Sequence, residues 1–256
     1  MGRLSKILII ISLINILIPS YIGYPYILPP TQVIEIMAKK FSKIKSAKII
    51  QITKVKGLEQ KKESIFEETI YIMSPELYRS EISNQQNKRL IIHNNKSTLK
   101  IVDGEIIYDS VNRDFVYNFL LMANNPERLF GILKEVGINI EQVSLARFDE
   151  KIAYQVGETE EERPKLLIDK ALFLPLLVRY GDVAIQFSDY RELPGSSWYP
   201  HRISYFSKDA FIEEYNIKSV TVNPYIDLSL FDIPLAKTQL INNKPAETSP
   251  PLSPDA

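Results

Sequence analysis

The sequence contains no cysteine, and this absence excludes several kinds of chemistry at once. Disulfide bonds, thiolate metal ligands and cysteine nucleophiles are all ruled out. A lipid-anchored lipoprotein is ruled out as well, because its processing requires a cysteine at the cleavage site. The absence suits an oxidising compartment but does not identify one.

Histidine is scarce, with only two in 256 residues. His93 and His201 lie far apart on predicted strands, and no His-x-His or His-x-x-x-His spacing brings two imidazoles together. Two isolated histidines make a weak metal site, since zinc commonly takes three or four protein ligands. We therefore predict no metal and no cofactor.

The chain also lacks net charge, because 31 basic residues balance 31 acidic ones. Binding to a nucleic-acid backbone depends on a basic surface that attracts phosphate groups. We therefore predict no nucleic-acid partner. The basic residues between Lys39 and Lys45 lie on a predicted helix, and transient contact of this helix with an anionic membrane surface is left open.

Motifs of common catalytic sites are missing too. The sequence has no Gly-x-Ser-x-Gly elbow, no Gly-rich phosphate loop and no dinucleotide-binding fingerprint. Adjacent carboxylates such as Glu67-Glu68 and Glu213-Glu214 point to opposite faces of a strand, so we interpret them as solvated charges. We predict no catalytic residues and no enzyme. The least favoured alternative is a hydrolase using His201 near Trp198 and Asp189, because nothing supplies a nucleophile with an oriented base.

One long apolar run is present, at the amino terminus. Two basic residues precede the almost wholly apolar residues 7–18, a pattern typical of a signal peptide. The run is shorter than the ~20 apolar residues that span a bilayer. We predict a signal peptide over residues 1–20, with Ser20 and Gly23 as candidate cleavage positions and export to the periplasm. An uncleaved anchor in the inner membrane is the alternative.

A linker and an amphipathic helix follow this segment. Residues 21–30 are rich in proline and tyrosine, and we interpret them as the linker. Pro29-Pro30-Thr31 then opens a helix with apolar residues at three- and four-residue spacing. Its apolar face consists of Val33, Met37, Phe41 and Ile44.

Short β-branched segments joined by turns predict an antiparallel sheet. The clearest hairpin joins residues 98–102 to 105–108 through Asp103-Gly104, since Asp-Gly readily adopts the positive φ angles of a tight turn. The other predicted strands cover residues 48–55, 64–73, 77–83, 89–93, 152–156, 165–168, 175–180, 183–190, 198–206 and 215–222, and the second group of strands begins at Ser144.

Two helices are predicted between the two groups of strands. The first covers the unusually apolar Phe115–Ala123, for which ordinary core packing and a lid over an apolar cavity are the competing interpretations. The second begins at Asn125-Pro126-Glu127, which combines an N-cap, a proline at the first position and an acid in the first turn. Gly137 ends it.

Together these elements predict one α+β domain over residues 31–235. The order of helix, strands, helices and strands favours a curved antiparallel sheet with helices on one side or inside its curve. Residues 236–256 are polar, rich in proline and without apolar periodicity, so we expect a disordered tail.

Six segments occur in an order that matches a known family. They are Phe41–Ser46 before the first strand, the Pro-centred Ser74–Arg79, the Asp-Gly hairpin Val102–Tyr108, the stretch Ile168–Leu176, Trp198–Ile203, and Val222–Pro234. In this order they resemble the LolA/LolB-like periplasmic lipoprotein carriers, the outer-membrane lipoprotein-sorting proteins. The resemblance covers about residues 30–235.

The resemblance implies a half-closed β-barrel of about eleven strands, with helices as a lid over a cavity for acyl chains. Sheltering a chain from water gains ~0.8 kcal/mol for each buried CH₂ group. The implied function is a periplasmic carrier or binding protein for lipid or lipoprotein acyl chains, in lipoprotein sorting or lipid transport. The alternative is an envelope interaction or sensor module of the same fold that binds a partner protein.

We place the hydrophobic ligand site on the lid and the strands that face it. Trp198, the single tryptophan, has ordinary core packing as its other interpretation. The predicted ligand-binding residues are Phe66, Ile70, Ile72, Leu99, Ile101, Phe115, Phe119, Met122, Leu129, Leu133 and Trp198.

Overall fold

The computed structural model describes most of the predicted domain. The predicted signal peptide, most of the linker, Phe115 and residues 243–256 lie outside the described residues. The structure describes residues 27–56, 63–73, 76–83, 88–95, 97–107, 116–122, 125–195 and 197–242.

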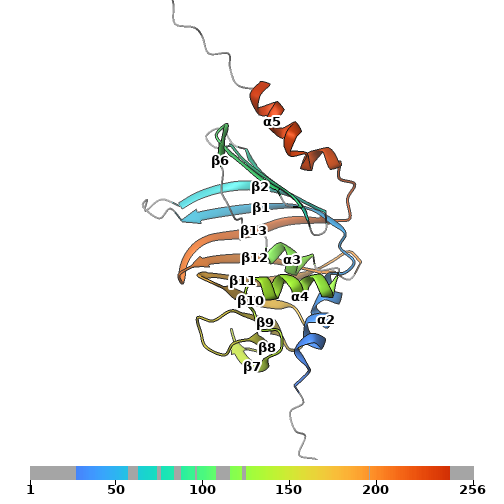
Figure 1. The fold of residues 1–256 in the computed structure, drawn as a ribbon, viewed down its shortest axis with the longest axis vertical. Helices are drawn as coiled ribbons and strands as arrows, with labels where there is room; N and C mark the ends of the chain where they lie inside the picture. The colour runs from blue at the N-terminus through green and yellow to red at the C-terminus, as the bar shows by residue number, and fades with distance from the viewer. Residues whose placement is uncertain are drawn as a thin grey trace, which may run out of the picture.

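Thirteen antiparallel strands form one curved sheet in the described residues (Figure 1). The strand order is β6-β5-β4-β3-β2-β1-β13-β12-β11-β10-β9-β8-β7, so neighbours are consecutive in the chain except where β1 pairs with β13. The sheet is open, with β6 and β7 at its edges. The predicted α+β fold with one curved antiparallel sheet is confirmed, with thirteen strands rather than about eleven.

The strands lie close to their predicted positions. They are β1 (Ser46–Lys56), β2 (Glu63–Met73), β3 (Leu77–Ser83), β4 (Lys88–Asn94), β5 (Ser97–Val102), β6 (Glu105–Ile107), β7 (Val143–Phe148), β8 (Lys151–Gly157), β9 (Lys165–Asp169), β10 (Pro175–Tyr180), β11 (Val183–Leu193), β12 (Ser197–Ser207) and β13 (Ala210–Val222).

Local turn and capping signals are confirmed. Asp103 and Gly104 join β5 to β6 with φ angles of 49° and 85°, as a two-residue hairpin turn requires. The side-chain oxygen of Asn125 accepts hydrogen bonds from the Glu127 and Arg128 amides at the start of α4. Gly137 follows the end of this helix with a φ of 85°.

The helices lie in two separate places relative to the sheet (Figure 1). The helices α2 (Pro30–Phe41), α3 (Val116–Leu121) and α4 (Pro126–Glu135) gather on one face, which we call the inner face. The 3₁₀ helix η2 (Leu228–Phe231) and α5 (Ile233–Asn242) follow β13. None of the described helices is long and apolar enough to cross a membrane.

The helix α5 corrects part of the predicted tail, because residues 236–242 are helical rather than disordered. Asp232 caps the helix: its carboxylate accepts a hydrogen bond from the Leu235 amide at 2.8 Å. The Ala236 side chain is buried in an apolar cluster on the sheet. Asp232 and Pro234 form a signal for the start of a helix. The prediction missed this signal because the residues farther along the chain are polar and rich in proline.

The two faces of the sheet carry different apolar clusters. The main core lies on the inner face, against α2, α3 and α4. Ile70 and Ile72 of β2 belong to it, whereas Tyr71 and Met73 pack against a second cluster. Because successive residues of a strand point to opposite faces, the second cluster lies on the outer face. Its buried members are Ile92, Leu99, Ile101, Ile226, Phe231 and Ala236.

Asn223 fastens the turn between α2 and β1 to the end of β13. Its side-chain oxygen accepts hydrogen bonds from the amides of Lys45 and Ser46 at 2.8 and 3.2 Å. Its side-chain nitrogen donates to the Lys43 carbonyl oxygen at 3.0 Å. Asn223 also has a φ of 51°, which asparagine tolerates better than most residues. The side chain therefore fixes the position of the turn that follows α2 relative to the sheet.

We expect Asn223→Ala to lower the free energy of unfolding by about 2 kcal/mol, through lost hydrogen bonds and through backbone strain at positive φ. Asn223→Gly is the matched control, since it removes the same hydrogen bonds without the strain and should cost about half as much. Urea unfolding of the three proteins measures both effects. A midpoint for Asn223→Ala equal to that of the unaltered protein would disprove the fastening role.

Candidate ligand-binding interior

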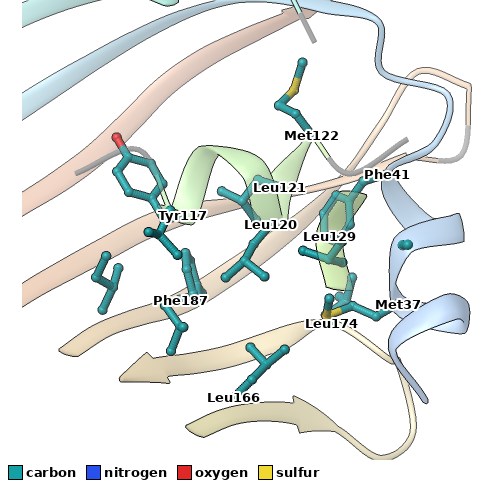
Figure 2. Packing of buried hydrophobic residues seen from close by; sticks show 14 of the residues in the cluster. Met37, Phe41, Tyr117, Leu120, Leu121, Met122, Leu129, Leu166, Leu174 and Phe187 are labelled. Atoms are coloured by element: carbon teal, nitrogen blue, oxygen red, sulfur yellow. The ribbon is translucent and has the colours of Figure 1, made fainter. Parts of the chain in front are cut away.

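The interior between the inner face and the helices is densely apolar. Figure 2 shows Met37 and Phe41 of α2 beside Leu129 of α4, and Leu120 of α3 above Phe187 of β11. All five side chains are buried. Side chains of the helices therefore fill the space against the inner face, as expected for protein interiors, which are packed as densely as organic crystals.

Five predicted site residues meet in this interior. Ile70 and Ile72 come from β2, Met122 follows α3, and Leu129 and Leu133 come from α4. All five are buried. The structure thus brings together strand and helix residues that lie far apart in the sequence.

Trp198 and Phe66 lie at the margin of this core. Trp198 of β12 is half-buried and packs against the main core. Phe66 is half-buried on β2, and by strand alternation it shares the inner face with Ile70. Both side chains are more accessible than the buried residues under the helices.

Leu99 and Ile101 lie elsewhere, in the outer-face cluster under η2 and α5. Leu99 pairs with Ile92 of β4, and both side chains pack toward Phe231. Strand alternation assigns Leu99 and Ile101 to one common face but does not tell which face the lid covers. The structure therefore separates these two residues from the other site residues that it describes.

The remaining two predicted residues are described incompletely or not at all. Phe119 lies within α3, between Tyr117 and Leu120, both of which are buried in the main core. Its own side chain, like the whole of Phe115, lies outside the described part of the structure. These two residues stay predictions.

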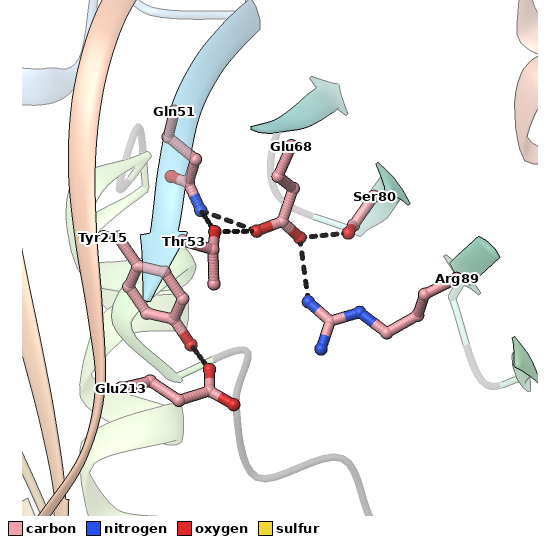
Figure 3. A network of polar contacts seen from close by, with 7 residues as sticks. All are labelled: Gln51, Thr53, Glu68, Ser80, Arg89, Glu213 and Tyr215. Carbon is pink, nitrogen blue, oxygen red and sulfur yellow. Dashed lines mark hydrogen bonds and ion pairs between the residues drawn. The ribbon is translucent and has the colours of Figure 1, made fainter. Parts of the chain in front are cut away.

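A buried polar cluster continues the inner face beyond the apolar core (Figure 3). At its centre is Glu68 of β2, which is 2% exposed. One carboxylate oxygen accepts hydrogen bonds from Gln51, at 2.8 Å, and from Thr53. The other accepts from Ser80 and, at 3.3 Å, from Nη2 of Arg89. Three neighbouring strands, β1, β3 and β4, thus direct polar side chains at a single carboxylate of β2.

Glu213 and Tyr215 of β13 complete the polar cluster. The Tyr215 hydroxyl donates a hydrogen bond to Glu213 at 2.5 Å, and the Tyr215 ring stacks on Tyr117 of α3 with centroids 6.1 Å apart. In Figure 3, the Arg89 guanidinium and the Glu213 carboxylate extend toward each other from opposite sides. The polar cluster therefore reaches the amino-terminal end of α3.

The charges of the polar cluster act on one another. Burial opposes the charged form of Arg89, but the negative charges of Glu68 and Glu213 outweigh it and raise the Arg89 pKa. Burial raises the pKa of Tyr215 well above its usual value, and the neighbouring Glu213 adds to the shift. At neutral pH the guanidinium is thus charged and the phenol is neutral.

Sequence reasoning missed this cluster. Glu68 was interpreted as a solvated charge because it follows another glutamate, and that interpretation is wrong. Its alternation with Ile70 and Ile72 was the available signal, since a residue two positions from two buried isoleucines shares their face.

A separate groove of about 1000 Å³ opens at the rim of the sheet. It lies between the β3–β4 end of the sheet, the first turn of α4 and the start of α5. None of the predicted ligand residues lines it. Its lining consists of Glu76, Asn94, Asn95, Ser97, Arg128, Leu228, Asp232, Ile233 and Pro234.

The two histidines do not form a shared site. Nδ1 of His93 on β4 lies 3.0 Å from the Thr98 hydroxyl, while Nδ1 of His201 on β12 lies 3.2 Å from the Tyr199 carbonyl oxygen. Burial lowers the pKa of both imidazoles. Asp189, the candidate partner of His201, accepts a hydrogen bond from Arg191 at 2.7 Å. Among the described residues, no group of three or more possible ligands could hold a metal ion.

An open, curved antiparallel sheet with helices packed on its inner face has the LolA-like fold. Among solved structures, a LolA superfamily protein from Nitrosomonas europaea matches with a TM-score of 0.56 at 10% identity, over 80% of this chain and 98% of that one. A DUF1329 family protein from Desulfovibrio piger matches with a TM-score of 0.52 at 10% identity, over 81% of this chain and 99% of that one. No protein-family model and no curated protein matches the sequence. The resemblance predicted from the ordered motifs is thus confirmed in the fold.

Proposed function

We propose that the protein is a periplasmic binding or carrier protein for acyl chains of lipids or lipoproteins, and not an enzyme. The observation that carries this proposal is the apolar inner face under α2, α3 and α4. Isoleucine and leucine side chains dominate this interface, followed by tyrosine and valine. An acyl chain that replaced helix side chains on this face would be sheltered from water at ~0.8 kcal/mol for each CH₂ group.

Binding requires the lid to move, because side chains of the helices fill the interior. The contacts of α3 and α4 with the sheet include packing of their side chains and two pairs, Tyr117 on Tyr215 and Arg128 with Glu76. The apolar contacts are replaceable, since an acyl chain offers the inner face an equivalent apolar surface, and the largely exposed Arg128–Glu76 ion pair contributes little. The proposed cycle is therefore an exchange between helix side chains and ligand. Export by residues 1–20 belongs to the same proposal.

A partner-binding module is the second candidate, and one observation favours it. Tyr225, Leu228 and Leu235 are exposed, at 95%, 61% and 41%, near the start of α5 and the rim groove. Exposed apolar side chains that adjoin a groove are typical of a docking surface. In this function the protein would bind another envelope protein through the outside of the fold.

Native mass spectrometry of the full chain, exported to a bacterial periplasm and purified without detergent, separates the two functions. We expect a co-purifying phospholipid or acylated peptide, identified after solvent extraction. The carrier function is disproved if no lipid co-purifies with the protein and the protein does not bind added 1-monolauroylglycerol. A stoichiometric protein partner in place of lipid would favour the docking module.

A further inference from the structure

The polar cluster has an unused hydrogen-bond donor at the end of the apolar interior. Nε of Arg89 is buried and has no hydrogen-bond partner among the described residues. Nδ2 of Asn118, the residue after Tyr117 in α3, is also buried and has no hydrogen-bond partner among the described residues. A buried donor without a partner costs about 1–3 kcal/mol. An acceptor supplied by a ligand would remove that cost.

Most of the carboxylate oxygens of the cluster, by contrast, already accept hydrogen bonds. Both oxygens of Glu68 receive hydrogen bonds from the cluster, and Glu213 receives one from Tyr215. The cluster contains two carboxylates, those of Glu68 and Glu213, and one guanidinium, that of Arg89. The two carboxylates therefore outnumber the positive charge. A negatively charged group would be repelled there. The complementary ligand group is therefore an uncharged acceptor.

The cluster also lies in line with the apolar surface. Thr53, Gln51, Ile49 and Ala47 follow one another on the inner side of β1, the first two in the cluster and the last two in the main core. At ~3.3 Å per residue, the stretch from Thr53 to Ala47 covers roughly 20 Å. One ligand can thus place a polar group on the cluster and a long chain on the core.

From these contacts we propose that Arg89 binds the carbonyl oxygen of the ester or amide group at the head of the acyl chain, so that the protein recognises an uncharged acyl linkage. The inference rests on the proposed function and names the part of the ligand that the inner face selects. The Arg89 side chain is 24% exposed, whereas its Nε is buried, so a ligand that reaches Nε must displace neighbouring side chains. Glu68 acts as a positioning residue that holds the guanidinium.

Two matched probes test this proposal by calorimetry on the full chain. The ester 1-monolauroylglycerol and the ether 1-O-dodecylglycerol have chains of equal carbon number, and only the ester has a carbonyl group. We expect the ester to bind about tenfold or more tightly, the gain of a hydrogen bond from a charged donor. Dodecanoate, which is anionic, should bind more weakly than the ester.

Variants assign the preference to Arg89. Removing Arg89 alone would leave Glu68 buried without its counter-charge, so the test variant is the double substitution E68Q/R89M. We expect it to bind the ester and the ether equally, with ether affinity unchanged. E68Q alone keeps one acceptor oxygen for the guanidinium and should lower the ester preference only in part. Arg89→Lys, which keeps the charge but lacks the Nε donor, should reduce the preference even if the double variant does not fold.

The outcomes separate this inference from the proposed function. If neither probe binds to the unaltered protein, the acyl-binding function itself fails. If both bind equally, or if dodecanoate binds more tightly than the ester, the function stands and the inference is overturned. An ester preference that survives in both E68Q/R89M and Arg89→Lys also overturns it.

Discussion

Replacing Glu68 with alanine is expected to lower the free energy of unfolding by about 3–5 kcal/mol. The substitution removes one carboxylate that accepts hydrogen bonds from Gln51, Thr53, Ser80 and Arg89. Three polar side chains of the sheet lose an acceptor in a place without bulk water. The guanidinium of Arg89 loses its closest counter-charge as well. Urea unfolding followed by circular dichroism measures the loss.

Two controls make this prediction specific. Glu81 lies on the outer face of β3, is 38% exposed at its side chain and pairs with Arg79. Glu81→Ala should change the free energy of unfolding by about 1 kcal/mol or less, because exposed ion pairs contribute little. Glu68→Gln keeps an acceptor oxygen and should fall between the two. A Glu68→Ala protein as stable as Glu81→Ala would contradict the structural role of the cluster.

The predictable parts of the fold are those that local chemistry decides. Asp103-Gly104 readily adopts the positive φ angles that a two-residue hairpin turn requires, and Asn125-Pro126 caps a helix through its own neighbours. Sheet curvature and the pairing of β1 with β13 depend on residues far apart in sequence. The ordered family motifs supplied that missing long-range information.

The candidate site was harder to predict, because strand alternation is symmetrical. It shows that Leu99 and Ile101 share one face, but the same pattern fits a residue under the lid and one under α5. Only the position of η2 and α5 decides between them. Glu68 shows the reverse problem, since its charge suggested solvent whereas its alternation with Ile70 placed it inside. A buried charge is recognised only once its partners from other strands are known.

The lid function proposed for α4 leads to the second large effect, on the rate of ligand binding. We expect Leu133→Ala in α4 to raise the association rate of 1-monolauroylglycerol by about tenfold or more. Leu133 is fully buried between α4 and the inner face, and truncation of such a leucine costs about 2–5 kcal/mol. That loss falls on the closed lid and not on a lid that has moved away. A larger fraction of the protein is then open, and the ligand enters more often. The fluorescence of Trp198, the single tryptophan at the core margin, follows the reaction by stopped flow.

Leu99→Ala is the matched control for this rate effect. Leu99 is 2% exposed, so its truncation should cost a similar free energy of unfolding, but it lies on the outer face under η2 and α5. A general loosening of the fold would speed binding in both variants, whereas release of the lid speeds it only in Leu133→Ala. Equal acceleration in the two proteins would therefore remove α4 from the entry path. It would direct attention to the rim groove beside α5, which Leu228 and Ile233 line.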